Sequence, residues 1–346
     1  MNNLFKFRMK AFALIALLLV GVSSAFAQQK IAIINAGSSG SRLYVYEFAD
    51  SKIVKFDSYT PETVLQLSTI ANTANAANAA NAAAQYIKTM TQLYSPTDPT
   101  DPIDLYILAT AGMRTVDSTK ADNIYKALKN VKPTGNYIIK DAKTISGRYE
   151  GLYAWIAANY DVLKDYKGNW GNLSNTKGIL EIGGQSMQIA YKNNGSSSDY
   201  IKRNHALIYS KSYVKGGANA IRGHYKDSLM VDSKVKPINI YQKDVPDLSS
   251  VSGITFYGLG GTINGANKYK NATNFVEKVD LIGSIEPDYY YNTHYLRWVL
   301  GQLGLLVNGK IDAKDADWTK GAAYDIVVND KADSIEAFNY SQTNPN

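Results

Sequence analysis

The stretch KIAIINAGSSGSRLYVYEF, residues 30–48, decides the fold. An apolar run leads into a turn that contains Gly37 and Gly40, and a second apolar run follows the turn. Alternating apolar residues on either side of a glycine–serine turn predict a β-hairpin with a loop of small residues. Because a strand rather than a helix follows the turn, the stretch is not the start of a Rossmann fold or of a P-loop.

A second stretch, GILEIGGQSMQIAY at residues 178–191, repeats the strand–turn–strand pattern. Each hairpin opens one half of the chain, which indicates a duplicated unit. The predicted fold class is therefore α/β, with two domains that face each other across a cleft. We expect the helix around Glu150 and a final helix near Trp318 to connect the two lobes, and the C-terminal segment to pack back on the first lobe.

Residues 71–94 are rich in alanine, and asparagine occurs at every third position from Asn72 to Asn81. Alanine is the best helix former and asparagine a mediocre one. This composition predicts a single helix with an exposed, low-complexity side that carries no chemistry.

Residues 1–27 are predicted to be a signal peptide. Three basic residues precede an apolar run at residues 11–22, and the small residues Ala25 and Ala27 predict cleavage before Gln28. A retained membrane anchor is the alternative. The leader carries three basic residues and no acidic one, so its removal lowers the formal net charge from +7 to +4. This mild charge does not indicate a nucleic-acid-binding arm.

The chain contains no cysteine. Disulfides, thiolate nucleophiles and cysteine–zinc sites are therefore excluded. An exported protein without disulfides fits a bacterial periplasm or culture medium, so we expect a secreted or periplasmic monomer without a stable membrane anchor.

Both glycine turns expose backbone N–H groups that can surround phosphate oxygens. In the first turn, Ser38, Ser39 and Ser41 add hydroxyl groups and Arg42 adds a fixed positive charge. An ordinary tight hairpin is the alternative for either loop alone. Two such loops, each preceded by a strand that ends in an amide or a carboxylate, favour phosphate binding by the pair.

Glu150 is an isolated carboxylate where a Ser-Gly turn becomes a helix within TISGRYEGLYAWIAANY, residues 144–160. A carboxylate near two anion-binding loops can act as a general base, a role that typically contributes ~10²–10⁴-fold in rate. The alternative is a solvated acid that favours the helix N-terminus. The histidines His205, His224 and His294 lack metal-ligand spacing and are expected to be structural or exposed.

Five stretches together resemble the ecto-apyrases, which are nucleoside triphosphate diphosphohydrolases of the actin/hexokinase/Hsp70 superfamily. The family motif D-A-G-S-[ST]-G-S-R is matched by NAGSSGSR at residues 35–42, and A-T-A-G-[ML]-R is matched fully at residues 109–114. The Ser-Gly, Glu-Gly, Trp and Asn-Tyr pattern is matched at residues 146–160, and L-D-L-G-G-A-S-x-Q is matched with replacements at residues 180–188. Residues 212–220, SYVKGGANA, resemble a later family segment, S-Y-L-G-x-G-x-N-x-A.

The resemblance implies two ribonuclease-H-like (actin-like) domains. Residues 28–147 together with about 319–346 would form the N-terminal lobe, and residues 148–318 the C-terminal lobe.

The resemblance also implies a role for each matched residue. Glu150 matches the general base, and Ser186 and Gln188 match the groups that hold the attacking water. Two aspartates that hold a metal through its waters are replaced here by Asn35 and Glu181. Phosphates would contact Gly37, Ser38, Ser39, Gly40, Ser41, Arg42, Thr110, Ala111, Gly183, Gly184 and Gln185.

The expected position of the base and ribose is less well matched. The family motif F-x-[AG]-x-[SG]-A-[FY]-[FY] ends in aromatic residues that are missing from the corresponding residues 256–263. Gly260 and Gly261 instead resemble the adenosine-contact turn of the superfamily. We expect Gly260, Gly261 and Tyr257 to contact the base or ribose, and three consecutive tyrosines at residues 289–291 are an alternative stacking surface.

The predicted function is an apyrase that hydrolyses nucleoside tri- and diphosphates at the terminal anhydride. Oxygen-only ligands favour Mg²⁺ or Ca²⁺ as the divalent cation. Two alternatives stay open, an exopolyphosphatase-type phosphatase of the same superfamily and a non-catalytic nucleotide sensor. The missing aromatic motif motivates the first, and the uncharged Asn35 motivates the second.

Overall fold

The computed structural model describes residues 29–75, 77–95, 101–166, 168–214, 216–220, 248, 251, 253–261, 263–264, 274–279, 295–297, 299–307 and 309–341. The predicted leader lies outside these ranges, as do His224, His294 and the tyrosines at residues 289–291. No helix in the described ranges combines the length and apolar character needed to cross a bilayer.

The first hairpin forms the centre of a five-stranded sheet with the order β3-β2-β1-β4-β5. Strand β2 is antiparallel to both β1 and β3, whereas β4 pairs in parallel with β1 and β5 pairs in parallel with β4. The strands are β1 (Gln29–Gly37), β2 (Gly40–Ala49), β3 (Lys52–Tyr59), β4 (Ile103–Ala109) and β5 (Tyr137–Thr144).

The second hairpin is central to a six-stranded sheet with the order β11-β10-β6-β7-β9-β8. Strand β6 is antiparallel to β7 and parallel to β10, so this sheet repeats the arrangement of the first around its own hairpin. The strands are β6 (Gly178–Ile182), β7 (Ser186–Lys192), β8 (Tyr200–Arg203), β9 (Ala206–Val214), β10 (Phe256–Leu259) and β11 (Ile311–Ala313).

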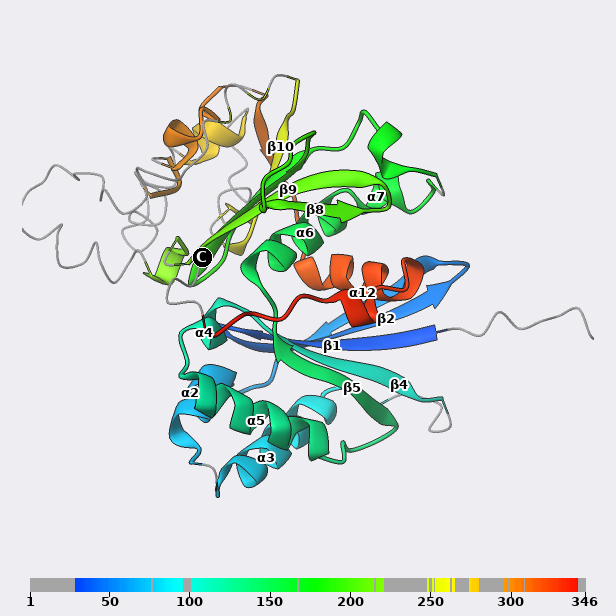
Figure 1. Ribbon diagram of the computed structural model, residues 1–346, viewed down its shortest axis with the longest axis vertical. Helices are drawn as coiled ribbons and strands as arrows, with labels where there is room; N and C mark the ends of the chain where they lie inside the picture. The colour runs from blue at the N-terminus through cyan, green and yellow to red at the C-terminus, as the bar shows by residue number, and fades with distance from the viewer. Residues whose placement is uncertain are drawn as a thin grey trace, which may run out of the picture.

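Side-chain alternation along β1 separates two cores. Ala32 and Ile34 pack against one layer of helices, whereas Ile31 and Ile33 face the space between the two sheets. The helices of the outer layer are α2 (Leu67–Thr73), α3 (Ala79–Thr91) and α5 (Ser118–Asn130), and Figure 1 shows them on the far side of the first sheet.

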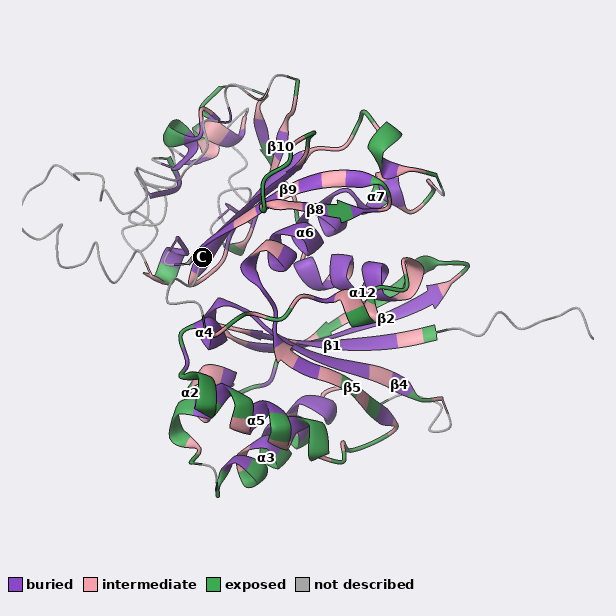
Figure 2. Ribbon diagram, in the orientation of Figure 1, coloured by how far each residue is buried: buried purple, intermediate pink, exposed green. Residues whose placement is uncertain are grey.

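Two helices, α6 (Gly147–Ala158) and α12 (Trp318–Val328), lie side by side between the sheets (Figure 1). Both are buried over most of their length (Figure 2), as expected for helices that are apolar on all sides. A Cβ added at Gly321 would overlap the carbonyl oxygen of Tyr153. The absence of a side chain at residue 321 therefore allows the two helices to approach each other closely.

The alanine-rich segment is not one helix, so this prediction was wrong. Helix α2 ends at Thr73 and α3 begins at Ala79. Between them the side-chain oxygen of Asn75 accepts a hydrogen bond of 2.9 Å from the backbone N–H of Asn78. Asparagine side chains compete in this way with helical hydrogen bonds, which accounts for the break.

The chain after α12 returns to the end of β5. Ala337 pairs with Ile145, and the backbone N–H of Ser146 donates to the carbonyl of Glu336 at 3.0 Å. The Tyr340 hydroxyl donates to the carbonyl oxygen of Met113 at 3.0 Å. The C-terminal segment therefore contacts both the residue that precedes α6 and the short helix at residues 111–114.

Candidate active site

The β1–β2 turn is the first component of the site. Gly40 has a φ of +137°, in a region that L side chains rarely adopt, so glycine suits the turn. The Tyr86 hydroxyl of α3 donates to the Ser41 Oγ at 2.8 Å, while Arg42 extends to the exposed side of β2. The turn is thus fixed from beneath, and Arg42 lies on its solvent-exposed side.

The β6–β7 turn is the second component. The N–H of Gly183 donates to the carbonyl of Ser186 at 3.0 Å and closes the hairpin. The backbone N–H groups of Ala218 and Asn219 donate to the carbonyls of Gly183 and Gly184 at 2.9 and 2.8 Å. A segment that follows β9 therefore holds the second turn in place.

The two turns meet each other directly. A Cβ added at Gly184 would lie 2.6 Å from the Ser39 Oγ and 2.7 Å from the Ser38 Oγ. The Asn219 Nδ2 also donates to the Ser39 Oγ at 3.3 Å. The structure therefore brings the two sequence-predicted phosphate loops together, although they are separated by about 145 residues of chain.

The segment after β4 packs on the first turn. Helix α4 (Ala111–Arg114) begins after the buried Thr110, and a Cβ added at Gly112 would lie 3.0 Å from the Cα of Ser38. Thr110 and Ala111 therefore lie next to the first loop, and the Thr110 N–H donates to the Ala36 carbonyl at 3.4 Å.

Glu150 is buried in the first turn of α6 and does not point into open solvent. Its Oε2 accepts from the Arg114 Nη2 at 2.6 Å and from the Gln188 Nε2 at 3.0 Å. Both of these hydrogen bonds engage the same carboxylate oxygen. Among the described residues no side chain donates to the other oxygen, Oε1, which is left for water or substrate.

Gln188 links Glu150 to two serines on neighbouring strands. Its Nε2 lies 2.6 Å from the Ser186 Oγ and 3.2 Å from the Ser212 Oγ. Its Oε1 is buried and has no hydrogen-bond partner in the described part of the chain. A buried acceptor without a partner is costly, so this oxygen is suited to receive a hydrogen from a bound water.

Two glycines bring the start of α6 onto β9. A Cβ at Gly147 would overlap the Ser212 side chain, and a Cβ at Gly151 would lie 2.5 Å from the Ser210 Oγ. Residues 147 and 151 lie one turn apart on the same face of the helix. Because neither has a side chain, α6 can approach β9 closely enough for Glu150 to contact Gln188.

Burial raises the pKa of Glu150 above its ordinary value, and the charge and hydrogen bond of Arg114 oppose this increase. The pKa of Glu181 is raised well above its ordinary value by burial and by repulsion from Glu150 and Asp317. Negative charge is therefore concentrated in the site, where a cation would relieve it.

Two oxygens at the predicted metal positions lack partners. The Asn35 Oδ1 and the Glu181 Oε2 are both buried and accept no hydrogen bond within the described ranges. Hard divalent cations and their waters bind such oxygens. Within those ranges no group of three or more His, Asp or Glu side chains is placed to ligate one metal ion directly, so Asn35 and Glu181 fit a cation held through water rather than one enclosed by carboxylates.

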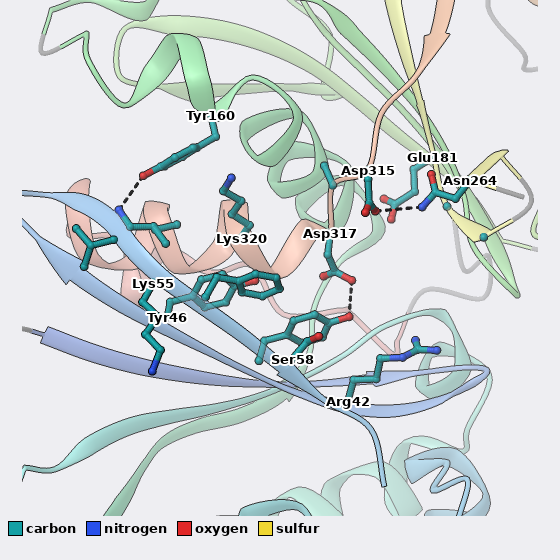
Figure 3. A pocket seen from close by; sticks show the side chains of 17 residues that line it. Arg42, Tyr46, Lys55, Ser58, Tyr160, Glu181, Asn264, Asp315, Asp317 and Lys320 are labelled. Carbon is teal, nitrogen blue, oxygen red and sulfur yellow. Dashed lines mark hydrogen bonds between the residues drawn. The ribbon is translucent and has the colours of Figure 1, made fainter. Parts of the chain in front are cut away.

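A cavity of about 650 Å³ opens beside the two hairpins (Figure 3). Arg42 and Glu181 contribute to its wall at one end, together with Gly260 and Gly261. Tyr257 does not line it. The Tyr257 ring is instead contacted by the ammonium groups of two lysines, Lys177 at 4.4 Å and Lys314 at 4.7 Å.

The sequence profile of the GDA1/CD39 (nucleoside phosphatase) family matches residues 26–218, more than half of the chain. The chain belongs to the GDA1/CD39 family. This confirms the predicted resemblance, since the matched range contains both hairpins, Arg114 and Glu150.

Several named relatives of this GDA1/CD39 protein share part of its sequence. The nucleoside-triphosphatase ntp-1 of Caenorhabditis elegans is 32% identical over 145 residues, which cover 37% of this chain and 26% of the relative. The nucleoside-diphosphatase mig-23 of the same organism is 29% identical over 182 residues, covering 46% and 32%. The mouse ectonucleoside triphosphate diphosphohydrolase 2 is 31% identical over 117 residues, covering 32% and 24%. The chain thus matches a third or less of the length of each.

Among solved structures, the Aquifex aeolicus member of the Ppx/GppA family is similar to this GDA1/CD39 chain with a TM-score of 0.50 and 14% identity. The similarity covers 87% of this chain and 98% of that chain. Together with the two sheets built around equivalent hairpins, it confirms the predicted fold class of two actin-like α/β domains.

Two neighbours of Glu150 were missed as site residues by sequence reasoning. Arg114 is the last residue of the fully matched motif at residues 109–114. Its permanent positive charge could have identified it as a partner for a buried carboxylate. Ser212 offered no such signal, because its place beside Gln188 depends on the pairing of β7 with β9. His205, by contrast, is exposed in the β8–β9 turn, as expected.

Proposed function

We propose that the chain hydrolyses nucleoside tri- and diphosphates at the terminal phosphoanhydride. The observation that carries this proposal is the Glu150–Gln188 pair beside two touching glycine turns. Within the described ranges the Gln188 Oε1 is buried without a partner, and the side-chain hydrogen bonds to Glu150 use only its Oε2. The family description, nucleoside phosphatase, supports the same substrate class.

Glu150 acts as the general base in this proposal. A water that donates one hydrogen to the Glu150 Oε1 and the other to the Gln188 Oε1 turns a lone pair toward the terminal phosphorus. Arg114 and the Gln188 amide hold the other carboxylate oxygen, so the base keeps one orientation. Ser186 positions the Gln188 amide. The raised pKa of Glu150 makes it a stronger base near neutral pH.

The two turns bind the phosphates. Backbone N–H groups of the turns at residues 37–42 and 183–185, apart from the Gly183 N–H that closes its hairpin, surround phosphate oxygens, with Thr110 and Ala111 beside them. Arg42 adds a positive charge. Phosphoryl transfer depends mainly on positioning and on charge neutralisation, which such groups provide.

Asn35 and Glu181 would hold a divalent cation, Mg²⁺ or Ca²⁺, through water molecules. When bound, the cation supplies positive charge that neutralises the phosphate oxygens. The unpartnered oxygens of both side chains support this assignment.

The proposed lobes comprise residues 28–147 with about 319–346, and residues 148–318. Helices α6 and α12, which lie between the two sheets, would be the connections about which the cleft opens and closes. The basic and apolar pattern of residues 1–27 supports export of the protein, and mass spectrometry of the secreted chain would test cleavage before Gln28.

The experiment is phosphate release from ATP, ADP and inorganic tripolyphosphate in the presence of Mg²⁺ or Ca²⁺, compared between the wild type and Glu150→Gln. We expect the variant to lose about 10²–10⁴-fold in kcat while it still binds nucleotide. Near-normal release by Glu150→Gln would remove the base assignment. Faster release from tripolyphosphate than from nucleotides would favour the exopolyphosphatase alternative, and tight binding without release by the wild type would favour the sensor.

A further inference from the structure

The segment after α12 crosses the point where the chain passes from β5 into α6. Residues 335–340 of this segment are called the C-terminal strap here. Figure 1 shows the segment, in red, running from α12 toward α4. The strap takes no part in the proposed chemistry, yet it contacts the chain on both sides of Ile145.

The strap pairs with the residues around Ile145 as a short antiparallel strand would. The N–H of Phe338 donates to the carbonyl of Thr144 at 2.8 Å. The N–H of Ser146 donates to the carbonyl of Glu336 at 3.0 Å. Because neighbouring residues of an extended chain direct their hydrogen-bonding groups to opposite sides, the backbone groups of Ile145 point away from the strap.

These backbone groups of Ile145 reach the surroundings of the proposed base. The Ile145 N–H donates to the carbonyl of Ala109 at 2.9 Å, and the Ile145 carbonyl accepts from the Arg114 Nε at 3.1 Å. The Arg114 Nη2 donates to the Glu150 carboxylate at 2.6 Å. One guanidinium is therefore held by Ile145 and in turn holds Glu150, so the strap fixes the peptide that orients Arg114.

The Tyr340 hydroxyl reaches the arginine from a second direction. It donates at 3.0 Å to the carbonyl of Met113, the residue before Arg114. Because a hydroxyl has only one hydrogen, the Thr144 Oγ1, which lies 2.7 Å away, must donate to Tyr340. By the same reasoning the Tyr125 hydroxyl, 2.6 Å from the Thr144 Oγ1, donates to Thr144. Three hydroxyls thus form a chain of fixed direction that ends at the backbone beside Arg114.

Glu336 attaches the strap to α6. The Arg148 Nε donates to its two carboxylate oxygens at 2.9 and 3.1 Å. Arg148 lies in the first turn of α6, two residues before Glu150. The strap therefore holds both partners of the buried pair, because Tyr340 contacts the segment of Arg114 and Glu336 contacts the helix of Glu150.

We propose that the C-terminal strap positions the Arg114–Glu150 pair and that Tyr340 is a positioning residue for the base. The inference rests on the proposed function, because it takes Glu150 to be the base. Tyr340 acts through Met113 and Arg114 rather than on the substrate. Loss of its hydroxyl lets the carboxylate move relative to the attacking water and leaves the phosphate loops unchanged. The effect therefore falls on kcat and not on KM.

The test is steady-state phosphate release from ATP by Tyr340→Phe, which removes only the hydroxyl. We expect kcat to fall roughly five- to tenfold, the worth of about one hydrogen bond, and KM to stay within about twofold of the wild-type value. Tyr137→Phe is the matched control. The Tyr137 hydroxyl donates to the carbonyl of Tyr94 at 2.9 Å, at the opposite end of β5 from Thr144. This variant loses the same kind of hydrogen bond and should keep kcat within about twofold.

A double-mutant cycle with Arg114→Lys tests the route from the strap to the base. Lysine lacks the planar fork of donors with which arginine bonds Ile145 and Glu150 together. If Tyr340 acts through this fork, Tyr340→Phe should lower kcat by less than about twofold when Arg114→Lys is already present.

Three results would overturn the proposal: an unchanged kcat in Tyr340→Phe, an equal loss of kcat in Tyr137→Phe, or a change confined to KM. An undiminished loss in the Arg114→Lys background would do the same. If Arg114→Lys does not fold, the comparison of the two tyrosine variants still decides. If the wild type releases no phosphate, the proposed function fails by itself. Denaturant unfolding of the wild type, the two single variants and the double variant then tests the positioning, and losses of stability that simply add would contradict it.

Discussion

The guanidinium of Arg114 lies 2.6 Å from the carboxylate of Glu150, and the side chains are only 1% and 8% exposed. The pair connects the short helix after β4 to the first turn of α6. It therefore joins the surroundings of the first phosphate loop to the proposed base.

Removal of Arg114 should destabilise the protein strongly. Arg114→Met leaves a buried carboxylate without its cation, and breaking a buried pair typically costs about 3–5 kcal/mol. Denaturant unfolding measures the effect. Arg148→Met is the control, since the pair between Arg148 and Glu336 is about one-third exposed and contributes less than a buried pair. The double variant Arg114→Met/Glu150→Gln should recover part of the loss, and no recovery would argue against the pair as the cause.

The pH dependence of hydrolysis should report the raised pKa of Glu150. A general base must be ionised, so kcat/KM should rise with pH through a midpoint above the ordinary glutamate pKa of about 4.3. Arg114 lowers this pKa while burial, the largest cause, and Asp317 raise it. Arg114→Lys, which keeps a positive charge but not the guanidinium geometry, should therefore move the acid limb less than Arg114→Met, which should shift it to higher pH. If the acid limb of the pH profile is identical in the wild type, Arg114→Lys and Arg114→Met, Glu150 is not the group that titrates.

The same shift has a consequence for stability. The pKa of Glu150 is higher in the folded protein than in the unfolded protein. The protonated carboxyl group therefore stabilises the fold fully at pH values below the unfolded-state pKa. This stabilisation is lost as the pH rises through the folded-state pKa. Unfolding free energies measured from pH 4 to pH 8 should therefore fall less in Glu150→Gln than in the wild type. If the unfolding free energy falls more steeply with pH in Glu150→Gln than in the wild type, the pKa of Glu150 is lowered in the folded protein rather than raised.

The close approach of α6 and α12 should depend on Gly321. In Gly321→Ala the new methyl group overlaps the Tyr153 carbonyl, so the helices must separate, and overpacking of this kind costs about 1–3 kcal/mol or more. Thermal unfolding measures the loss. Gly261→Ala is the matched control because its Cβ meets no atom within 4 Å. Equal stability of the two variants would show that the helices have room to move apart.

Divalent cations should stabilise the protein through Asn35 and Glu181. Ligands that bind only the folded state raise the melting temperature by an amount that grows with the ratio of free ligand to its dissociation constant. We expect Mg²⁺ or Ca²⁺ to raise the Tm of the wild type and EDTA to reverse this, with a smaller increase in Glu181→Gln. Asn35→Asp, which adds a carboxylate at the other position, should enlarge the increase. A cation effect that is unchanged in both variants would place the ion elsewhere.

Local sequence predicted much of the site. Glycine turns flanked by alternating apolar residues were sufficient to place both hairpins, and the position of Glu150 after a Ser-Gly turn matched its place in the first turn of α6. The parts that sequence did not predict depend on long-range packing. Ser212 reaches Gln188 only because β9 pairs with β7, and Phe56 lines the cavity only because β3 folds back beside β2. The break at Asn75 was missed because a side-chain hydrogen bond overrode the helix propensity of the alanines.

The contact between Gly184 and the serines of the opposite turn also has a practical consequence. A polyanion cannot lie between these two tips while they touch, so the proposed phosphate binding requires the two turns to separate before the ligand enters. Crystals grown without nucleotide in this arrangement would resist soaking, because the lattice would oppose the movement. Co-crystallisation with a slowly hydrolysed analogue is therefore the better route to the loaded enzyme.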